Sequence, residues 1–194
     1  MTDHRAGRER LGFDLRVCQE LAFLIEEWGF RLVTQTTTFV RFESRRLFIQ
    51  VFHGRISYEV GVEFGWTDRP DDPFPLALAT SRDDERFLQT SARTPDRVAA
   101  AVRTAADLVR EFVHPDVLGT REGREAVAAR SAEARRQLAL RSVAYKARPK
   151  ALSAFRSRDW ETVVREFSKM EPLLSNSERK KLELARARVR GGHR

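Results

Sequence analysis

The stretch that decides the fold runs from Phe39 to Trp66 and reads FVRFESRRLFIQVFHGRISYEVGVEFGW. Its last part alternates, because Tyr58, Val60, Val62 and Phe64 are separated by Ser57, Glu59, Gly61 and Glu63. A strand with one buried face has this period of two. Two shorter runs, 39–43 and 47–52, precede it, and the connections Ser44-Arg45-Arg46 and His53-Gly54-Arg55 are short enough for hairpins. The stretch therefore predicts a three-stranded antiparallel meander, or four strands if 30–33 leads it with the polar run 34–38 as the turn between them.

Helical patterns lie on both sides of this meander. From Phe13 to Trp28 apolar residues recur every three or four positions until Gly29. A second amphipathic pattern begins with Thr94 as N-cap and Pro95 at the first helical position, and it ends near His114-Pro115. We expect an α+β domain over residues 11–115 in which two helices pack on one face of the sheet.

The rest of the chain differs in charge and composition. Residues 1–115 hold 16 Arg and no Lys against 18 Asp and Glu, a net charge of −2, whereas residues 116–194 hold 20 Lys and Arg against 10 acids, a net charge of +10. Good helix formers dominate this second part, which predicts a basic helical extension with a long helix over about 120–146 and three shorter helices after it. Ser175 and Glu178 have capping-box spacing for the last of these helices. Residues 1–10 lack periodicity and are expected to be a disordered terminus.

The long helix has a seam. At about 100° per residue, Val127, Ala134, Leu138 and Tyr145 fall on one line, which could dock on a partner or pair with a second copy. Arginines and lysines flank it. The residues that could neutralise phosphates are Arg130, Arg135, Arg136, Arg141, Lys146, Arg148 and Lys150.

The chain shows little sign of catalysis. It has no P-loop, no dinucleotide fingerprint and no nucleophile elbow, and His4, His53, His114 and His193 are not spaced as metal ligands with Cys18. We therefore predict a protein that is not an enzyme and uses no cofactor or metal. This prediction would be revised in favour of an enzyme if the fold placed His53, His114 or the acids of residues 68–85 together in one cleft.

The composition also suggests a compartment. A single cysteine rules out an internal disulfide framework, no signal-peptide pattern follows Met1, and no apolar run reaches the roughly 20 residues that cross a bilayer. A cytoplasmic protein without membrane contact is the expectation.

Two resemblances add to these patterns. The helix, the meander with its Phe42-Glu43-Ser44 turn and the segment Ser57-Tyr58-Glu59 resemble small uncharacterised bacterial α+β proteins, some of them similar to toxin-immunity proteins, over residues 11–115. This resemblance implies a cytoplasmic binder that masks a partner protein. Residues 147–170, with small residues, Phe155 and an Asp159-Trp160 helix start, resemble a single tetratricopeptide-like hairpin.

The predicted function is therefore a protein-interaction module, of immunity type or an accessory subunit of a bacterial toxin or defence system. Its candidate partner-binding residues are Phe48, Phe52, Glu59 and Glu63, on the sheet face turned away from the helices. The proline-rich loop from Thr67 to Ser91 could instead cover that face. The alternative function is nucleic-acid association through the basic helices.

Overall fold

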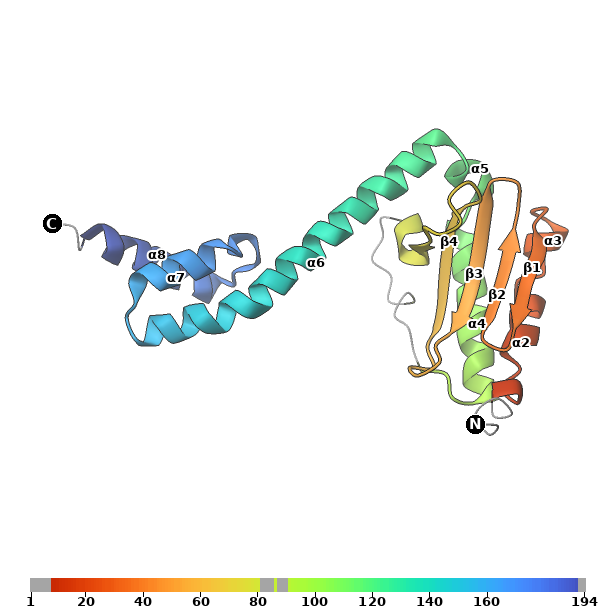
Figure 1. Ribbon diagram of the computed structural model, residues 1–194, viewed down its shortest axis with the longest axis horizontal. Helices are drawn as coiled ribbons and strands as arrows, with labels where there is room; N and C mark the ends of the chain where they lie inside the picture. The colour runs from red at the N-terminus through yellow and green to blue at the C-terminus, as the bar shows by residue number, and fades with distance from the viewer. Residues whose placement is uncertain (1–7, 81–85, 87–90, 192–194) are drawn as a thin grey trace. The chain divides into compact units, whose positions relative to one another are not determined.

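The computed structural model describes residues 8–80, 86 and 91–191 (Figure 1). The chain divides into two compact units, Met1–Ser131, called unit 1, and Ala132–Arg194, called unit 2. Each unit is described by itself below.

Unit 1 is built on an antiparallel sheet whose strands follow one another in chain order. The order is β1-β2-β3-β4-β5, a meander without crossovers. The strands are β1 (Arg31–Thr36), β2 (Phe39–Glu43), β3 (Leu47–His53), β4 (Val60–Trp66) and the two-residue β5 (Phe74–Pro75). The predicted α+β meander is confirmed, and β5 extends it by one short strand.

Helices cover one face of this sheet. They are α2 (Phe13–Glu20), α3 (Phe23–Glu26) and α4 (Pro95–Phe112), with the short η1 (Leu76–Ala79) and α5 (Pro115–Leu118). In Figure 1, α2 and α4 lie behind the strands, and none of the described helices of unit 1 lies in front of them. Thr94 caps α4 as predicted, because its side chain accepts a hydrogen bond from the Arg97 N–H.

The core of unit 1 lies between the sheet and these helices. Alternate strand residues point into it, among them Val40, Phe42, Ile49, Val51 and Phe64, which are fully buried. Phe13, Val17, Val102 and Val109 meet them from the helices. The period of two therefore sorts β2, β3 and β4 into a core face and a second face.

Three local expectations were wrong. The first helical pattern is interrupted at Leu21, where α2 ends, so that α3 follows as a separate turn. The polar run at Thr34 was expected to form a turn, but β1 extends to Thr36 and leaves a two-residue hairpin loop. Tyr58 is not in β4, because it adopts a left-handed conformation with φ 58°.

The long helix α6 (Arg121–Arg156) crosses the division between the units. Its start belongs to unit 1, where Val127 joins the core and where the indole N–H of Trp66 donates to the Leu118 carbonyl, 2.9 Å away, just before α6. These contacts explain why the division falls after Ser131 and not at the expected 115–116. The helix also continues past the expected end near 146, through Pro149.

Unit 2 consists of the rest of α6 and two further helices. They are α7 (Trp160–Ser168) and α8 (Asn176–Gly191), joined by the short η3 (Glu171–Leu173). The first of the three shorter helices expected after 146 is thus part of α6. A line of small residues on α6, Ala144, Ala147, Ala151 and Ala154, packs against Val163, Phe167, Met170, Leu174 and Leu182.

The helix ends of unit 2 follow the predicted signals. The Asp159 carboxylate accepts from the Thr162 N–H at 3.1 Å, and Ser175 and Glu178 form a reciprocal capping box at 2.8 and 3.3 Å. Glu178 also accepts from Arg148 of α6 at 2.7 Å, and Arg148 donates a second bond to the Leu173 carbonyl. The Arg148–Glu178 pair therefore ties α6 to the start of α8.

Candidate functional site

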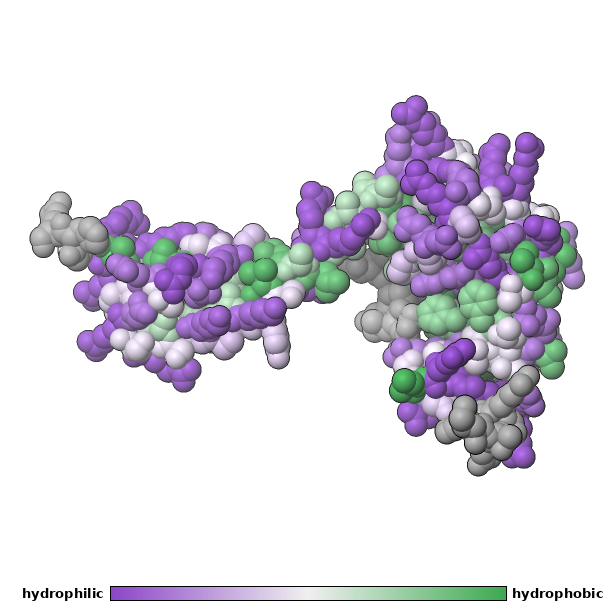
Figure 2. All heavy atoms as spheres, viewed as in Figure 1, coloured by the Kyte–Doolittle hydropathy of each residue, from purple (hydrophilic) through white to green (hydrophobic). Residues whose placement is uncertain are grey.

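The candidate site is the sheet face opposite α2 and α4, which we call the outer face. Figure 2 shows it from the front, where pale-green apolar atoms over the strands are bordered by hydrophilic ones. It is formed by the side chains of β2, β3 and β4 that alternate with the core residues. They are Phe39, Arg41, Glu43, Phe48, Gln50, Phe52 and Glu63, with Gly61 and Gly65 between them.

Two phenylalanine rings lie against glycines on this face. Phe48 stands opposite Gly65 and Phe52 opposite Gly61 in the β3–β4 register. A Cβ atom added to Gly65 would lie 2.5 Å from the Phe48 ring, and one added to Gly61 would lie 2.2 Å from the Phe52 ring. The rings occupy the space that side chains on β4 would fill, so glycine is what lets them lie close to the sheet.

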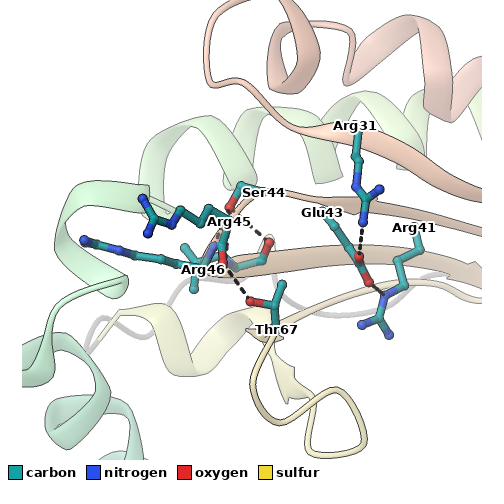
Figure 3. A network of polar contacts seen from close by, with 8 residues as sticks. Arg31, Arg41, Glu43, Ser44, Arg45, Arg46 and Thr67 are labelled. Atoms are coloured by element: carbon teal, nitrogen blue, oxygen red, sulfur yellow. Dashed lines mark hydrogen bonds and ion pairs between the residues drawn. The ribbon is translucent and has the colours of Figure 1, made fainter.

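Between the rings runs a chain of polar contacts across four strands, which we call the polar ladder. Arg31 and Arg41 reach Glu43 at 3.5 and 2.9 Å (Figure 3). Arg41 also donates to Gln50 at 3.3 Å, and the Gln50 amide donates to Glu63 at 2.7 Å. Each of these side chains is therefore held by a neighbour on the next strand or on its own.

Arg41 also connects the polar ladder to the rings. Its guanidinium carbon lies 3.8 Å from the centre of the Phe48 ring, within the range of a cation–π interaction. Its side chain is 15% exposed and that of Glu43 is 19% exposed. The outer face is thus a half-buried surface with restrained side chains, unlike a face of long solvated chains.

A turn closes one end of this surface. The Ser44 hydroxyl donates to the Leu47 carbonyl and accepts from the Leu47 N–H, both at 3.1 Å, and Thr67 donates to the Arg45 carbonyl at 3.0 Å. Figure 3 shows Arg45 and Arg46 extending together from this turn. Both are exposed, so two cations stand at the edge of the outer face.

The four predicted partner-binding residues do not share one environment. Phe48 is fully buried, so its ring shapes the outer face and does not itself offer a contact to a partner. Phe52 and Glu63 are half-buried on the outer face. Glu59 precedes β4 and forms an isolated β-bridge with Ser91. The loop that was expected to cover the face lies partly outside the described residues, at 81–85 and 87–90.

Sequence reasoning missed Arg41, Glu43 and Gln50. Each alternates with core residues in its strand, so the period of two could have placed them on the outer face. Nothing in a single strand states which of them bond to one another, because that depends on the register between strands. The available signal was Gly61 and Gly65, whose spacing of four on one face marks two close approaches.

His53 is buried at the end of β3 and engaged on both ring nitrogens. Arg8 Nη1 lies 3.4 Å from Nδ1, and a guanidinium can only donate, so Nδ1 carries the lone pair. Nε2 then carries the proton and donates to the Ala92 carbonyl at 2.9 Å. Burial and the Arg8 charge lower the pKa of His53, which the bond to the Ala92 carbonyl opposes only in part. The ring stacks on Phe13 and meets Tyr58 edge-on.

Where the structure describes them, the groups considered for catalysis are not brought together. His53 lies near Ala92, before α4, and the exposed His114 follows the other end of that 18-residue helix, about 27 Å away along its axis. Asp68 is paired with Arg124 at 2.7 Å. Burial, followed by the Asp14 carboxylate, raises the pKa of the Cys18 thiol. Among the described residues, no three His, Cys, Asp or Glu side chains are grouped to hold a metal ion.

The predicted phosphate-binding residues are divided by the structure. Arg130 donates to the Leu78 and Ala79 carbonyls, Arg148 bonds to Glu178, and Arg136 pairs with Glu133. Arg135 also has an interaction within the chain. Arg141, Lys146 and Lys150 are exposed and form no ion pair with any described residue.

Comparisons with protein-family models, with curated proteins and with solved structures find no match. None of the described helices is long and apolar enough to span a bilayer.

Proposed function

We propose that this chain is a non-enzymatic protein-binding module that engages a partner protein through the outer face of its sheet. The proposal keeps the role implied by the resemblance to immunity proteins, a cytoplasmic bacterial protein that masks a partner or serves as an accessory subunit. It rests on one observation, the restrained and half-buried character of the outer face.

The physical reason is preorganisation. Binding costs conformational entropy for every flexible side chain that becomes fixed, about 0.5–1.5 kcal/mol for each long one. On the outer face, the polar ladder already restrains Arg41, Glu43, Gln50 and Glu63. Half-buried aromatic rings beside arginine are a composition enriched where proteins meet. A partner would meet this surface with little further ordering.

The test places a photo-crosslinking amino acid at position 52, on the outer face, in cells that express the full chain. We expect one discrete protein adduct. Charge reversal by Glu59→Lys with Glu63→Lys should remove it, because the half-buried Glu63 lies on the outer face and the half-buried Glu59 directly precedes β4. Circular dichroism should show an intact fold.

The matched control is Glu26→Lys, an exposed charge reversal on α3 in the same unit. It should leave the adduct unchanged. An adduct that persists in the Glu59→Lys, Glu63→Lys protein, or that Glu26→Lys removes equally, would contradict the assignment of the outer face.

A second candidate function is binding of nucleic acid by unit 2. Residues 132–194 carry 17 Lys and Arg against 7 acids, a net charge of +10. Four of those acids, Glu133, Glu166, Glu171 and Glu178, are bonded to Arg or Lys side chains of the same unit. Internal pairing therefore uses most of the acids and leaves a surplus of cations at the surface.

The salt dependence of binding tests this second function. If unit 2 neutralises Z phosphates, the logarithm of the association constant for duplex DNA should fall with a slope of about −0.9Z against the logarithm of salt concentration. Arg141→Gln with Lys146→Gln should lower that slope by about two. Absence of binding to DNA and RNA at low ionic strength would exclude this function.

A further inference from the structure

A second surface of different chemistry lies on α6, within unit 2. Residues 132–139 and 141–143 of α6 are exposed, and Leu140 is half-buried. This section therefore presents nearly its whole circumference to solvent, whereas the following turns pack against α7 and α8. A helix in this position is expected to be polar on all sides.

It is not polar on all sides. Leu138 is 69% exposed and Tyr145 is 82% exposed. They are seven residues apart, two helical turns, and so lie on one line with Ala134 one turn earlier. We call Ala134, Leu138, Arg141 and Tyr145 the α6 stripe.

The α6 stripe is distinct from the face of α6 that builds the core of unit 2. That core uses Ala144, Ala147, Ala151 and Ala154. At roughly 100° per residue, this line of alanines lies well around the helix from Leu138 and Tyr145. The core of unit 2 therefore gives no reason for a leucine and a tyrosine on the stripe. Anchors spaced by one heptad are what a helix offers to another amphipathic helix.

The charge of this section of α6 indicates which kind of helix would bind to it. Between Ala132 and Arg156 the only acid is Glu133, which is paired with Arg136, whereas seven residues are Arg or Lys. Arg141 lies within the stripe and Lys146 beside it, both exposed and without an ion pair among the residues described. Two copies of this section would bring like charges together, which opposes self-pairing. A helix with acidic flanks would instead pair with them.

We propose that the α6 stripe docks an acidic amphipathic helix of a partner protein. The apolar line of that helix would cover Leu138 and Tyr145, and its flanking carboxylates would pair with Arg141 and Lys146. The apolar side chains of Leu138 and Tyr145 favour a protein helix over a nucleic acid as the partner, because a phosphate makes no favourable contact with a leucine. The α6 stripe is independent of the outer face, so either surface can fail without the other.

Two designed helical peptides test the proposal on the full chain. Both carry the same heptad leucine seam, and one has Glu and the other Lys at the flanking positions. Fluorescence anisotropy of labelled peptide should show that the Glu peptide binds and that the Lys peptide binds at least about tenfold more weakly. Leu138→Ser with Tyr145→Ser should weaken binding of the Glu peptide about tenfold or more.

Charge exchange gives the sharpest result. Arg141→Glu should weaken binding of the Glu peptide and strengthen binding of the Lys peptide. The matched control is Val143→Ser, which removes an exposed apolar residue from the same section but from another side of the helix. It should leave the binding of both peptides unchanged.

Several outcomes would overturn the proposal. One is equal affinity for the two peptides, or affinity for neither. Another is a dimer in light scattering that Leu138→Ser with Tyr145→Ser dissolves, since the occupant would then be a second copy. A third is binding of an oligonucleotide that Arg141→Glu removes while the Glu peptide does not bind, which would assign this section to phosphates.

Discussion

Gly65 and Gly61 form a matched pair for testing the outer face at the scale of single residues. A Cβ at position 65 would push against the ring of Phe48, which is fully buried and lies under Arg41. We expect Gly65→Ala to lower the free energy of unfolding by about 1–3 kcal/mol, as overpacking does elsewhere. Urea denaturation measures the difference.

Gly61→Ala is the control for that prediction. The Phe52 ring that it would displace is only half-buried and can rotate toward solvent. Its loss of stability should therefore be clearly smaller than that of Gly65→Ala. Equal losses would show that the burial of Phe48 does not decide the cost.

His53 predicts a pH dependence. Its pKa is lowered in the folded protein, so the unfolded chain binds a proton that the folded chain does not. Stability from the neutral ring is present above the unfolded pKa of about 6.5 and is lost as the pH falls toward the lower folded pKa. Between pH 7.5 and 5.5 the loss is at most about 1.4 kcal/mol.

Denaturation of the wild type and of His53→Gln at both pH values measures this effect. Glutamine can donate to the Ala92 carbonyl and accept from Arg8 without titrating. The other charged groups around the ring are Arg8 and Arg93, which both lie against Tyr58. The pH dependence should shrink in His53→Gln, and an unchanged pH dependence would exclude His53 as its source.

At the scale of elements, the Arg148–Glu178 pair carries a prediction about helix docking. Arg148→Met would leave the nearly buried Glu178 carboxylate and the Leu173 carbonyl without this donor. We expect a loss of about 1–3 kcal/mol in the unfolding of unit 2, because a polar group buried without its partner costs that much.

Arg141→Met on the same helix is its control. Arg141 is exposed and has no ion pair with a described residue, so its substitution should change stability by less than about 0.5 kcal/mol. Thermal unfolding followed at 222 nm compares the two. Similar melting temperatures would mean that Arg148 contributes little to docking α6 on α8.

Sequence reasoning was most successful for elements whose signals are local. The caps at Thr94 and Asp159 and the capping box from Ser175 to Glu178 each depend on residues three positions apart. The period of two also separated the core face of β3 from its second face. These features need no knowledge of distant parts of the chain.

Sequence reasoning was least successful where contacts between residues far apart in the sequence determine the structure. The burial of Phe48 depends on Arg41 from another strand, and the engagement of Arg130 depends on carbonyls 52 and 51 residues away. Tyr58 fits the strand alternation, yet its left-handed turn lies between Arg8 and Arg93. Register and tertiary contact, not propensity, set these outcomes.

At the scale of the whole molecule, the division into units predicts where proteases cut. Residues 132–143 of α6 lie at the start of unit 2 and, except for the half-buried Leu140, are exposed. Exposed chain with few buried contacts opens locally at low cost in free energy. Brief trypsin digestion should cut after Arg135, Arg136 or Arg141, and mass spectrometry identifies the two fragments.

Lys169 gives the internal comparison for this digestion. It is ion-paired with Glu166 and precedes the fully buried Met170, so cleavage there should be absent at the same time point. First cuts inside 8–80 or 160–190 would contradict the expectation that the exposed section of α6 opens more easily than those two parts of the chain.

The pairing of rings with glycines has a consequence for how this sequence can vary. What β3 and β4 share at Phe48 and Gly65 is a fixed sum of side-chain volume, not two separate identities. A larger residue at 65 is compatible with the same surface only if residue 48 becomes smaller, whereas 61 and 52 are coupled more weakly because Phe52 is half-buried. Substitutions at 48 and 65 should therefore be tolerated in pairs. A variant library scored for folding would show the residues at these two positions changing together.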